Sequence, residues 1–191
     1  MKKIYLPFIF FIFAYSSNAQ TRHVELRSSI GFLSDAHFAT ALDKSTTAFF
    51  DAFFTKDQED FRIATSGIFS QELLITFDDP HLQLVGSYVY EQLKIIDYIN
   101  NTPSAYNRYM NTALMGVHYN YVMKQKFSVY SGVEMGVRFN TYSGKTEQIN
   151  TRQFAYHITG CGIRYGEAVA GFTELGFGAK GWLRTGLVVS F

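Results

Sequence analysis

The sequence predicts an all-β fold, an eight-stranded antiparallel up-and-down transmembrane β-barrel with a short helix in its first external loop. Apolar and polar residues alternate with a period of two along most of the chain, which is typical of strands with two different faces. Short turns alternate with longer links, as expected of strands that run up and down around a barrel. No stretch after residue 20 reaches about 18 consecutive apolar residues, so the sequence predicts no membrane-spanning helix.

The composition limits the class of protein. A length of 191 residues allows one domain, or two small ones at most. The formal charge of +1 excludes a strongly basic nucleic-acid-binding surface. A single cysteine excludes a disulfide framework and any metal cluster held by several cysteines. Aromatic residues make up 17% of the chain, yet the mean hydropathy is only −0.03. The apolar residues are therefore expected to occupy separate faces rather than continuous runs.

Residues 1–19 have the three parts of a secretory signal peptide. Lys2 and Lys3 form a basic start, residues 4–15 are an almost unbroken apolar run, and small residues precede the cleavage point after Ala19. The apolar run would reach only about 18 Å as a helix, against a hydrocarbon core of roughly 30 Å, which argues against a membrane anchor. We therefore expect an exported barrel domain at residues 20–191.

Eight segments have the character of strands. In the clearest one, 127–140, Val133, Met135 and Val137 share one face, whereas Glu134 and Arg138 share the other. Two long segments, 61–77 and 82–98, lose phase midway, as a bulge causes. The second also fits a helix, but its content of Val, Tyr and Ile favours a strand. The expected strands are 23–33, 61–77, 82–98, 112–123, 127–140, 153–165, 169–178 and 182–191.

The links between the strands fall into two groups. Residues 78–81, 124–126 and 166–167 are short turns, whereas 34–60, 99–108 and 142–152 are longer links, and only 179–181 breaks the trend. In membrane barrels short turns lie at the periplasmic rim and long loops lie outside, so both chain ends are expected at the periplasmic rim.

The polar faces favour a membrane barrel over a soluble one. A soluble barrel buries its apolar face inside, whereas a membrane barrel turns that face toward lipid. Small residues suit a narrow lumen, and the polar faces carry six glycines: Gly116, Gly132, Gly136, Gly176, Gly178 and Gly186. The same faces carry charges of both signs, which can pair across a lumen. We predict a lumen polar network of Glu134, Arg138, Glu174, Arg184, His118 and His157, which Glu25 and Arg27 of the first strand could join.

The end of the chain resembles the C-terminal signal of outer-membrane barrels. Residues 184–191 hold a glycine at Gly186, hydrophobic residues around Val189, and a terminal Phe191. With residues 172–181, which are similar to the penultimate strand of many such proteins, the chain resembles the porin-family or outer membrane protein A and X-like barrels of Gram-negative bacteria. The resemblance implies the cell outer membrane and contact with its lipid and lipopolysaccharide. It also implies periplasmic chaperones and the barrel-assembly machinery in transit, but no activity.

The candidate catalytic residues in the sequence leave three functions open. Some small outer-membrane barrels are lipid A deacylases that use a His-x-Ser pair, and His157 and Thr159 are the closest match here. Because both are expected to face the lumen, and threonine replaces serine, we predict no enzymatic role. We expect a monomeric, non-enzymatic envelope structural or surface-interaction component. The alternatives are a narrow pore for small solutes and a lipid A-modifying enzyme.

The segment 34–60 is the most unusual link. Its phenylalanines recur at helical spacing, so the sequence predicts a short amphipathic helix. Such a helix would touch the lipopolysaccharide interface, cap the barrel mouth or contact an extracellular partner, and the alternative is a loop that packs against itself. The residues expected to carry such an interaction are Phe49, Phe50, Phe53 and Phe54. Elsewhere, the five histidines lack metal-ligand spacing, no cofactor is expected, and Cys161 is predicted to be a small lumen residue.

Overall fold

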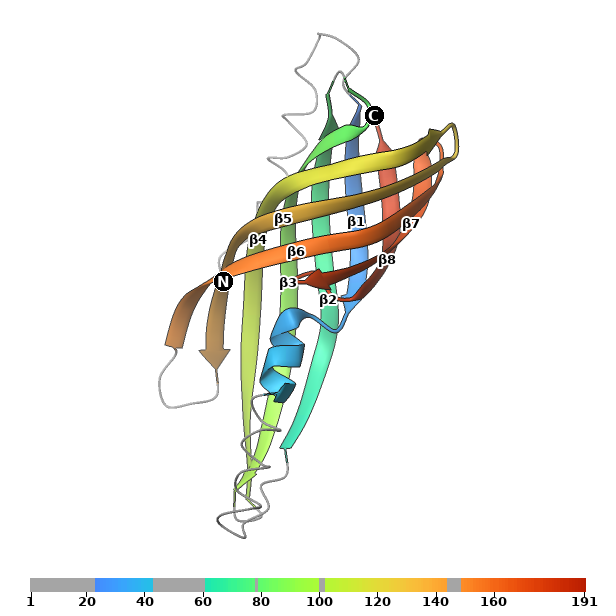
Figure 1. Ribbon diagram of the computed structural model, residues 1–191. Coiled ribbons are helices and arrows are strands. Elements are labelled where there is room, and N and C mark those ends of the chain that lie inside the picture. The colour runs from blue at the N-terminus through green and yellow to red at the C-terminus, as the bar shows by residue number, and fades with distance from the viewer. Residues whose placement is uncertain (1–22, 43–60, 78, 100–101, 144–148) are drawn as a thin grey trace.

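The computed structural model describes residues 23–42, 61–77, 79–99, 102–143 and 149–191. It confirms the predicted fold, a closed antiparallel barrel in which each strand pairs with its neighbour in sequence and the first strand pairs with the last (Figure 1). The strands are β1 (Val24–Phe32), β2 (Phe61–Thr76), β3 (Leu82–Ile99), β4 (Thr102–Lys124), β5 (Phe127–Ser143), β6 (Ile149–Gly166), β7 (Val169–Gly178) and β8 (Leu183–Ser190). Within the described ranges, no helix is both long and apolar enough to cross a membrane. The expected signal peptide, residues 1–19, lies outside the described residues.

The two rims of the barrel differ. The terminal rim holds the start of β1, the end of β8 and the short turns β2–β3, β4–β5 and β6–β7. The loop rim is uneven, because β1, β7 and β8 have 8 to 10 residues whereas β2 to β6 have 16 to 23. Figure 1 shows β2, β3 and β4 continuing well past the level at which β1 ends. One side of the barrel wall is therefore much taller than the other.

Two of the links predicted from the sequence are wrong, because the strands of the tall wall extend into them. Residues 99–108 were expected to form a long link, but β3 and β4 stay paired out to Ile99 and Thr102. Residues 142–152 are also largely strand, since β5 ends at Ser143 and β6 begins at Ile149. These extensions lack an apolar alternation, and a paired strand with two polar faces is hard to distinguish from a loop in sequence.

Bulges were predicted in both 61–77 and 82–98, and the structure has a bulge only in the first of these segments. In β2 the register shifts between Thr65 and Ile68, where Gly67 has a φ of 85°, so the predicted bulge is confirmed. In β3 the predicted bulge is wrong, because the pairing runs without a shift from Leu82 to Ile99. Its lumen face carries the apolar Val85, Val89 and Leu93 among polar residues. Their spacing of four gave this strand its resemblance to a helix.

A short helix, residues 35–42, follows β1 at the loop rim (Figure 1). Ser34 caps it, because the Ser34 hydroxyl accepts a hydrogen bond from the backbone N–H of His37 at 3.0 Å. The same hydroxyl donates to Glu91 of β3 at 2.7 Å. Ala36 packs against Leu93 and Met110 on the inner wall. The helix therefore caps the barrel mouth, one of the roles predicted for this segment, while Phe49, Phe50, Phe53 and Phe54 lie outside the described residues.

We expect Ser34→Ala to loosen this helix. The substitution removes the cap and the hydrogen-bond donor to Glu91, at a cost of about 1 kcal/mol. That cost corresponds to roughly a fivefold faster amide hydrogen exchange of residues 35–42. Ser34→Thr keeps the hydroxyl and is the matched control, so exchange in that variant should stay close to wild type. Equal exchange in wild type and Ser34→Ala would contradict the capping role.

Candidate functional site

The middle of the lumen is filled by six buried charged side chains, which we call the central ion cluster. Alternation along the strands points each of them inward, except Lys180, which comes from the β7–β8 turn. The cluster consists of Arg27 (β1), Glu72 (β2), Glu134 (β5), Glu174 (β7), Lys180 and Arg184 (β8), and none is more than 3% exposed. Three carboxylates thus face three cations, which leaves no net charge for the lumen to solvate.

The charges of the cluster are joined in a continuous row. Arg184 donates to both oxygens of Glu174, from Nε to Oε2 and from Nη2 to Oε1, each at 2.6 Å. It also pairs with Glu72, with Nη2 3.2 Å from Oε2. Lys180 then links Glu72 to Glu134 through its ammonium group. The order Glu174–Arg184–Glu72–Lys180–Glu134 therefore crosses the lumen with the two signs alternating.

Hydroxyl groups and one histidine ring also contact the carboxylates of the cluster. Tyr130 donates its hydroxyl to Glu174 at 2.6 Å, and Thr159 donates to the same carboxylate at 3.1 Å. Ser87 donates to Glu134 at 2.6 Å, and Nε2 of His118 lies 3.3 Å from that carboxylate. With these partners all eight strands contribute to the cluster, and it holds together opposite walls of the barrel.

A second polar layer lies between the cluster and the loop rim. Arg138 pairs with Asp35 of the helix at 2.6 Å and donates to Thr112 at 3.3 Å. Arg108 donates to Thr40 of the helix at 3.3 Å. The helix is thus tied to the barrel by an ion pair and by hydrogen bonds. An apolar layer separates this level from the cluster and consists of Ile68, Val89, Leu114, Ala155 and Ala179.

The residues predicted to form one lumen network are all buried, but they belong to different levels. Glu134, Glu174 and Arg184 meet in the central ion cluster, with His118 at its edge. Arg138 lies apart, bound to the loop helix. The expectation that Arg27 joins the network agrees with its position, since Nη1 lies 3.7 Å from Glu174.

His157 and Thr159 are both buried in the lumen. The Thr159 hydroxyl is engaged with Glu174, and neither ring nitrogen of His157 has a hydrogen-bond partner among the described residues. The histidine is therefore not placed to take a proton from Thr159, as a nucleophile–base pair requires.

Two members of the cluster were missed in the sequence. Glu72 lies on β2, where the bulge near Gly67 hides the alternation. Lys180 was placed only in the short link 179–181 and given no role, but it is fully buried. Gly178 and Gly181, with φ of 126° and 93°, fold this turn back over the barrel, and Trp182 anchors it to the carbonyl of Phe32 at 2.9 Å. No sequence signal distinguishes such a turn from an exposed one.

The predicted position of Cys161 is wrong. The register between β6 and β7 shifts between Thr159 and Cys161, so the alternation reverses at Gly160. Cys161 consequently lies exposed on the outer face, and Gly162 takes the lumen position instead. A bulge of one residue moves the side chains beyond it to the opposite face.

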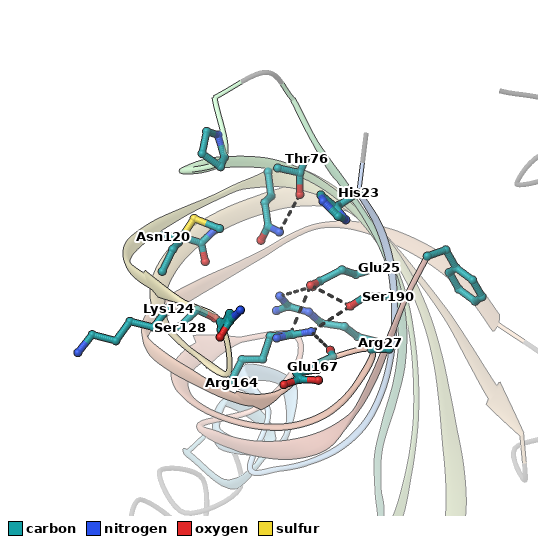
Figure 2. A pocket seen from close by; sticks show the side chains of 16 residues that line it. His23, Glu25, Arg27, Thr76, Asn120, Lys124, Ser128, Arg164, Glu167 and Ser190 are labelled. Atoms are coloured by element: carbon teal, nitrogen blue, oxygen red, sulfur yellow. Dashed lines mark hydrogen bonds and ion pairs between the residues drawn. The ribbon is translucent and has the colours of Figure 1, made fainter. Parts of the chain in front are cut away.

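A cavity of about 430 Å³ lies at the terminal rim, and we call it the terminal vestibule (Figure 2). Glu25 lies between two guanidinium groups, accepting from Nη2 of Arg27 at 3.0 Å and lying 3.3 Å from Nε of Arg164. Arg164 also donates to Ser190 at 2.9 Å. The Arg27 guanidinium lies 4.7 Å from the ring centre of Tyr130 and closes the inner end. The vestibule thus ends at the cluster rather than crossing the barrel.

The remaining predicted residues lie at the end of the chain. Val189 and Phe191 are exposed on the outer face near the terminal rim. Gly186 lies against Ser28 of β1, where a Cβ atom would collide with the Ser28 carbonyl oxygen. Glycine therefore permits the close approach of β8 and β1 that closes the barrel.

Comparisons with protein-family models, with curated proteins and with solved structures find no match for this chain. Among the described residues, no group of three or more His, Cys, Asp or Glu side chains is arranged to hold a metal ion.

We expect Lys180→Met to destabilise the barrel strongly. It leaves Glu72 and Glu134 facing each other without their shared cation, which costs about 3–5 kcal/mol. Adding Glu134→Gln removes the surplus charge and should restore part of the loss. The measurement is denaturant unfolding in detergent micelles, followed by the fluorescence of Trp182, the only tryptophan in the sequence.

The matched control is the exposed ion pair of Lys126 and Glu167, whose side chains are 61% and 63% exposed. Lys126→Met should change the stability by less than about 1 kcal/mol, because water screens such a pair. If Lys180→Met and Lys126→Met had equal effects, the cluster would not be a major stabilising element.

Proposed function

We propose that this chain is a non-enzymatic β-barrel of the outer membrane of a Gram-negative cell, of the porin-family or outer membrane protein A and X type, that serves the envelope as a structural or surface-interaction component. The observation that carries the proposal is the polarity of the two barrel faces. On β5 the outward Met135 is 61% exposed, while its neighbour Glu134 is buried in the lumen. A soluble barrel has the opposite arrangement.

The extent of the outward apolar face fits a bilayer. On β5 this face runs from Phe127 to Phe139. At about 3.3 Å per residue and a strand tilt of about 45°, the segment spans roughly 28 Å, close to the apolar band of about 25 Å in membrane barrels. An apolar belt of this size would be unfavourable in water.

Aromatic side chains gather at both edges of the outward face. Near the loop rim a row of ring contacts at 5.8–6.4 Å joins Phe38, Trp182, Phe177, Tyr156 and Phe154. Near the terminal rim His81, Tyr119 and Tyr121 form a similar row at 5.2–5.8 Å. Such girdles are typical of the two membrane–water interfaces. Phe38 belongs to the loop helix, so the helix would touch the lipopolysaccharide interface as well as cap the mouth.

The uneven rims support an orientation and a role. Membrane barrels keep their short turns in the periplasm, so the terminal rim would be periplasmic and the tall wall of β2 to β6 would project outside the cell. This projection and the loop helix would form the surface for an extracellular partner. A structural role is supported by the central ion cluster, which fills the lumen with side chains already paired with each other.

We expect the purified protein to require detergent or lipid and to migrate differently on gels before and after boiling. The apolar outward face would aggregate in water, whereas a closed barrel in detergent resists unfolding without heat. A monodisperse protein in detergent-free buffer, with no change of mobility on boiling, would contradict the membrane proposal and favour a lipocalin-like barrel.

The terminal vestibule favours a narrow conduit as the second candidate function, because it opens the lumen at the terminal rim. We expect no ion conductance in planar bilayers, since an eight-stranded lumen is filled by side chains and the cluster interrupts the path. Asp35→Asn, which weakens only the attachment of the loop helix, should be equally silent. Lys180→Ala combined with Glu134→Ala removes one charge of each sign from the cluster and should also be silent, because the apolar layer that contains Ile68 and Leu114 still closes the lumen above the cluster. Conductance steps in the folded wild type would support the conduit instead.

A further inference from the structure

One sector of the outward face carries polar side chains in the middle of its strands. We call Ser28, Gln71, Thr173 and Thr185 the polar patch; they lie on β1, β2, β7 and β8, which are consecutive around the closed barrel. Apolar outward residues lie on both sides of the patch along its strands. Leu26 and Ile30 flank Ser28, and Phe69 and Leu73 flank Gln71. The patch is therefore enclosed within the apolar belt rather than being part of its edge.

The opposite sector carries Ser131 of β5 at this depth, but the Ser131 hydroxyl is paired with the Tyr121 hydroxyl at 2.6 Å. The outward side chains around it in the middle of β4, β5 and β6 include the large apolar Met115, Val117, Val133, Met135, Val137 and Ile158. Two sectors of one barrel that faced only lipid chains would be expected to share a composition. The difference indicates that the polar patch meets a different neighbour.

The hydrogen bonds of the patch are incomplete. Ser28 donates to Oε1 of Gln71 at 2.9 Å, and the hydroxyls of Thr173 and Thr185 lie 3.3 Å apart. Among the described residues, the amide nitrogen of Gln71 has no hydrogen-bond partner. A lipid chain offers no acceptor, so an unpaired amide at this depth costs free energy.

The surface beside Gln71 is hollow. A depression of about 520 Å³ lies between β2, β1 and β8, and Ile30, Phe69 and Leu187 form part of its lining. On the neighbouring β7, a Cβ atom added at Gly171 would find only one heavy atom within 4 Å. Small residues and hollows allow close approach of another protein within a membrane.

We propose that two copies of this chain associate in the membrane through the polar patch, around a two-fold axis close to Gln71. A primary amide carries both a donor and an acceptor, so two Gln71 side chains can pair reciprocally, each N–H donating to the other carbonyl oxygen. Threonine and serine hydroxyls are self-complementary in the same way. An isologous interface needs such self-complementarity, which selects a second copy over a lipid. This inference rests on the proposed membrane location, and it replaces the monomer expected from the sequence.

The test is disulfide cross-linking of the full barrel in lipid vesicles. Cys161, the only native cysteine, is first replaced by serine. Ile30→Cys places a reporter beside the patch without changing its polar groups, and Met135→Cys places a matched reporter on the opposite sector. Under mild oxidation, and at a high ratio of lipid to protein, we expect a dimer band from Ile30→Cys and none from Met135→Cys.

The role of the amide is tested by adding Gln71→Leu to the Ile30→Cys variant. Loss of two reciprocal hydrogen bonds should lower the dimer fraction by about tenfold, while the shift of mobility on boiling stays unchanged. An unchanged dimer fraction would overturn the role of Gln71.

Equal cross-linking of both reporters would indicate random collision and overturn the interface, as would no cross-linking at all. In native envelopes, an Ile30→Cys adduct with a mass other than that of two chains would assign the patch to a different protein and overturn self-association. In these cases the barrel still requires detergent. A water-soluble, heat-insensitive barrel would instead overturn the membrane proposal itself.

Discussion

The structure depends on charge neutrality within a narrow lumen. Three carboxylates and three cations occupy the centre of the barrel, and each isolated charge would be too costly to keep there. Arg184 and Lys180 each hold two carboxylates, so the loss of either cation removes a partner from two carboxylates at once. The interior is therefore specified by the pairing of charges rather than by the volume of apolar side chains, which distinguishes this barrel from one with an apolar core.

The neighbouring layers follow from that centre. Toward the loop rim, apolar side chains from β2, β3, β4 and β6 cover the cluster, and above them Arg138 holds the loop helix through Asp35. Toward the terminal rim, Arg27 stacks between the rings of Tyr130 and Phe172 and separates the cluster from the vestibule. Each layer meets the cluster with groups that pair with its charges or cover them, so lumen polarity and rim architecture are coupled.

The fold was predictable from the sequence where the two faces differ in chemistry. In β5 the alternation of Val133, Glu134 and Met135 indicates both the strand and its orientation, and the structure agrees. The prediction failed where that difference disappears. Residues 102–108 of β4 are mostly polar, include a proline and lack an apolar alternation, so they resembled a loop although β4 is paired with β3 as far as Thr102 and Ile99.

The candidate site was predictable only in part for a related reason. Glu134, Glu174 and Arg184 stand out because each is a charge on a regular strand. Lys180 owes its burial to a turn that folds inward at two glycines, a property of backbone geometry rather than of local composition. The position of Cys161 depends on one residue of bulge, which moves a side chain from lumen to surface without changing the local pattern of residue types.

The β7–β8 hairpin has a consequence for the order of assembly. It supplies two of the three cations of the central ion cluster, Lys180 and Arg184, whereas Glu72 and Glu134 belong to strands that precede it in the chain. A sheet formed only by β1 to β6 would carry two carboxylates with Arg27 as the only cation among the cluster residues present. Docking of the hairpin therefore joins β8 to β1 and neutralises the interior in one event. The last two strands therefore close the barrel, and a partly assembled intermediate without them would bear excess negative charge along its open lumen face.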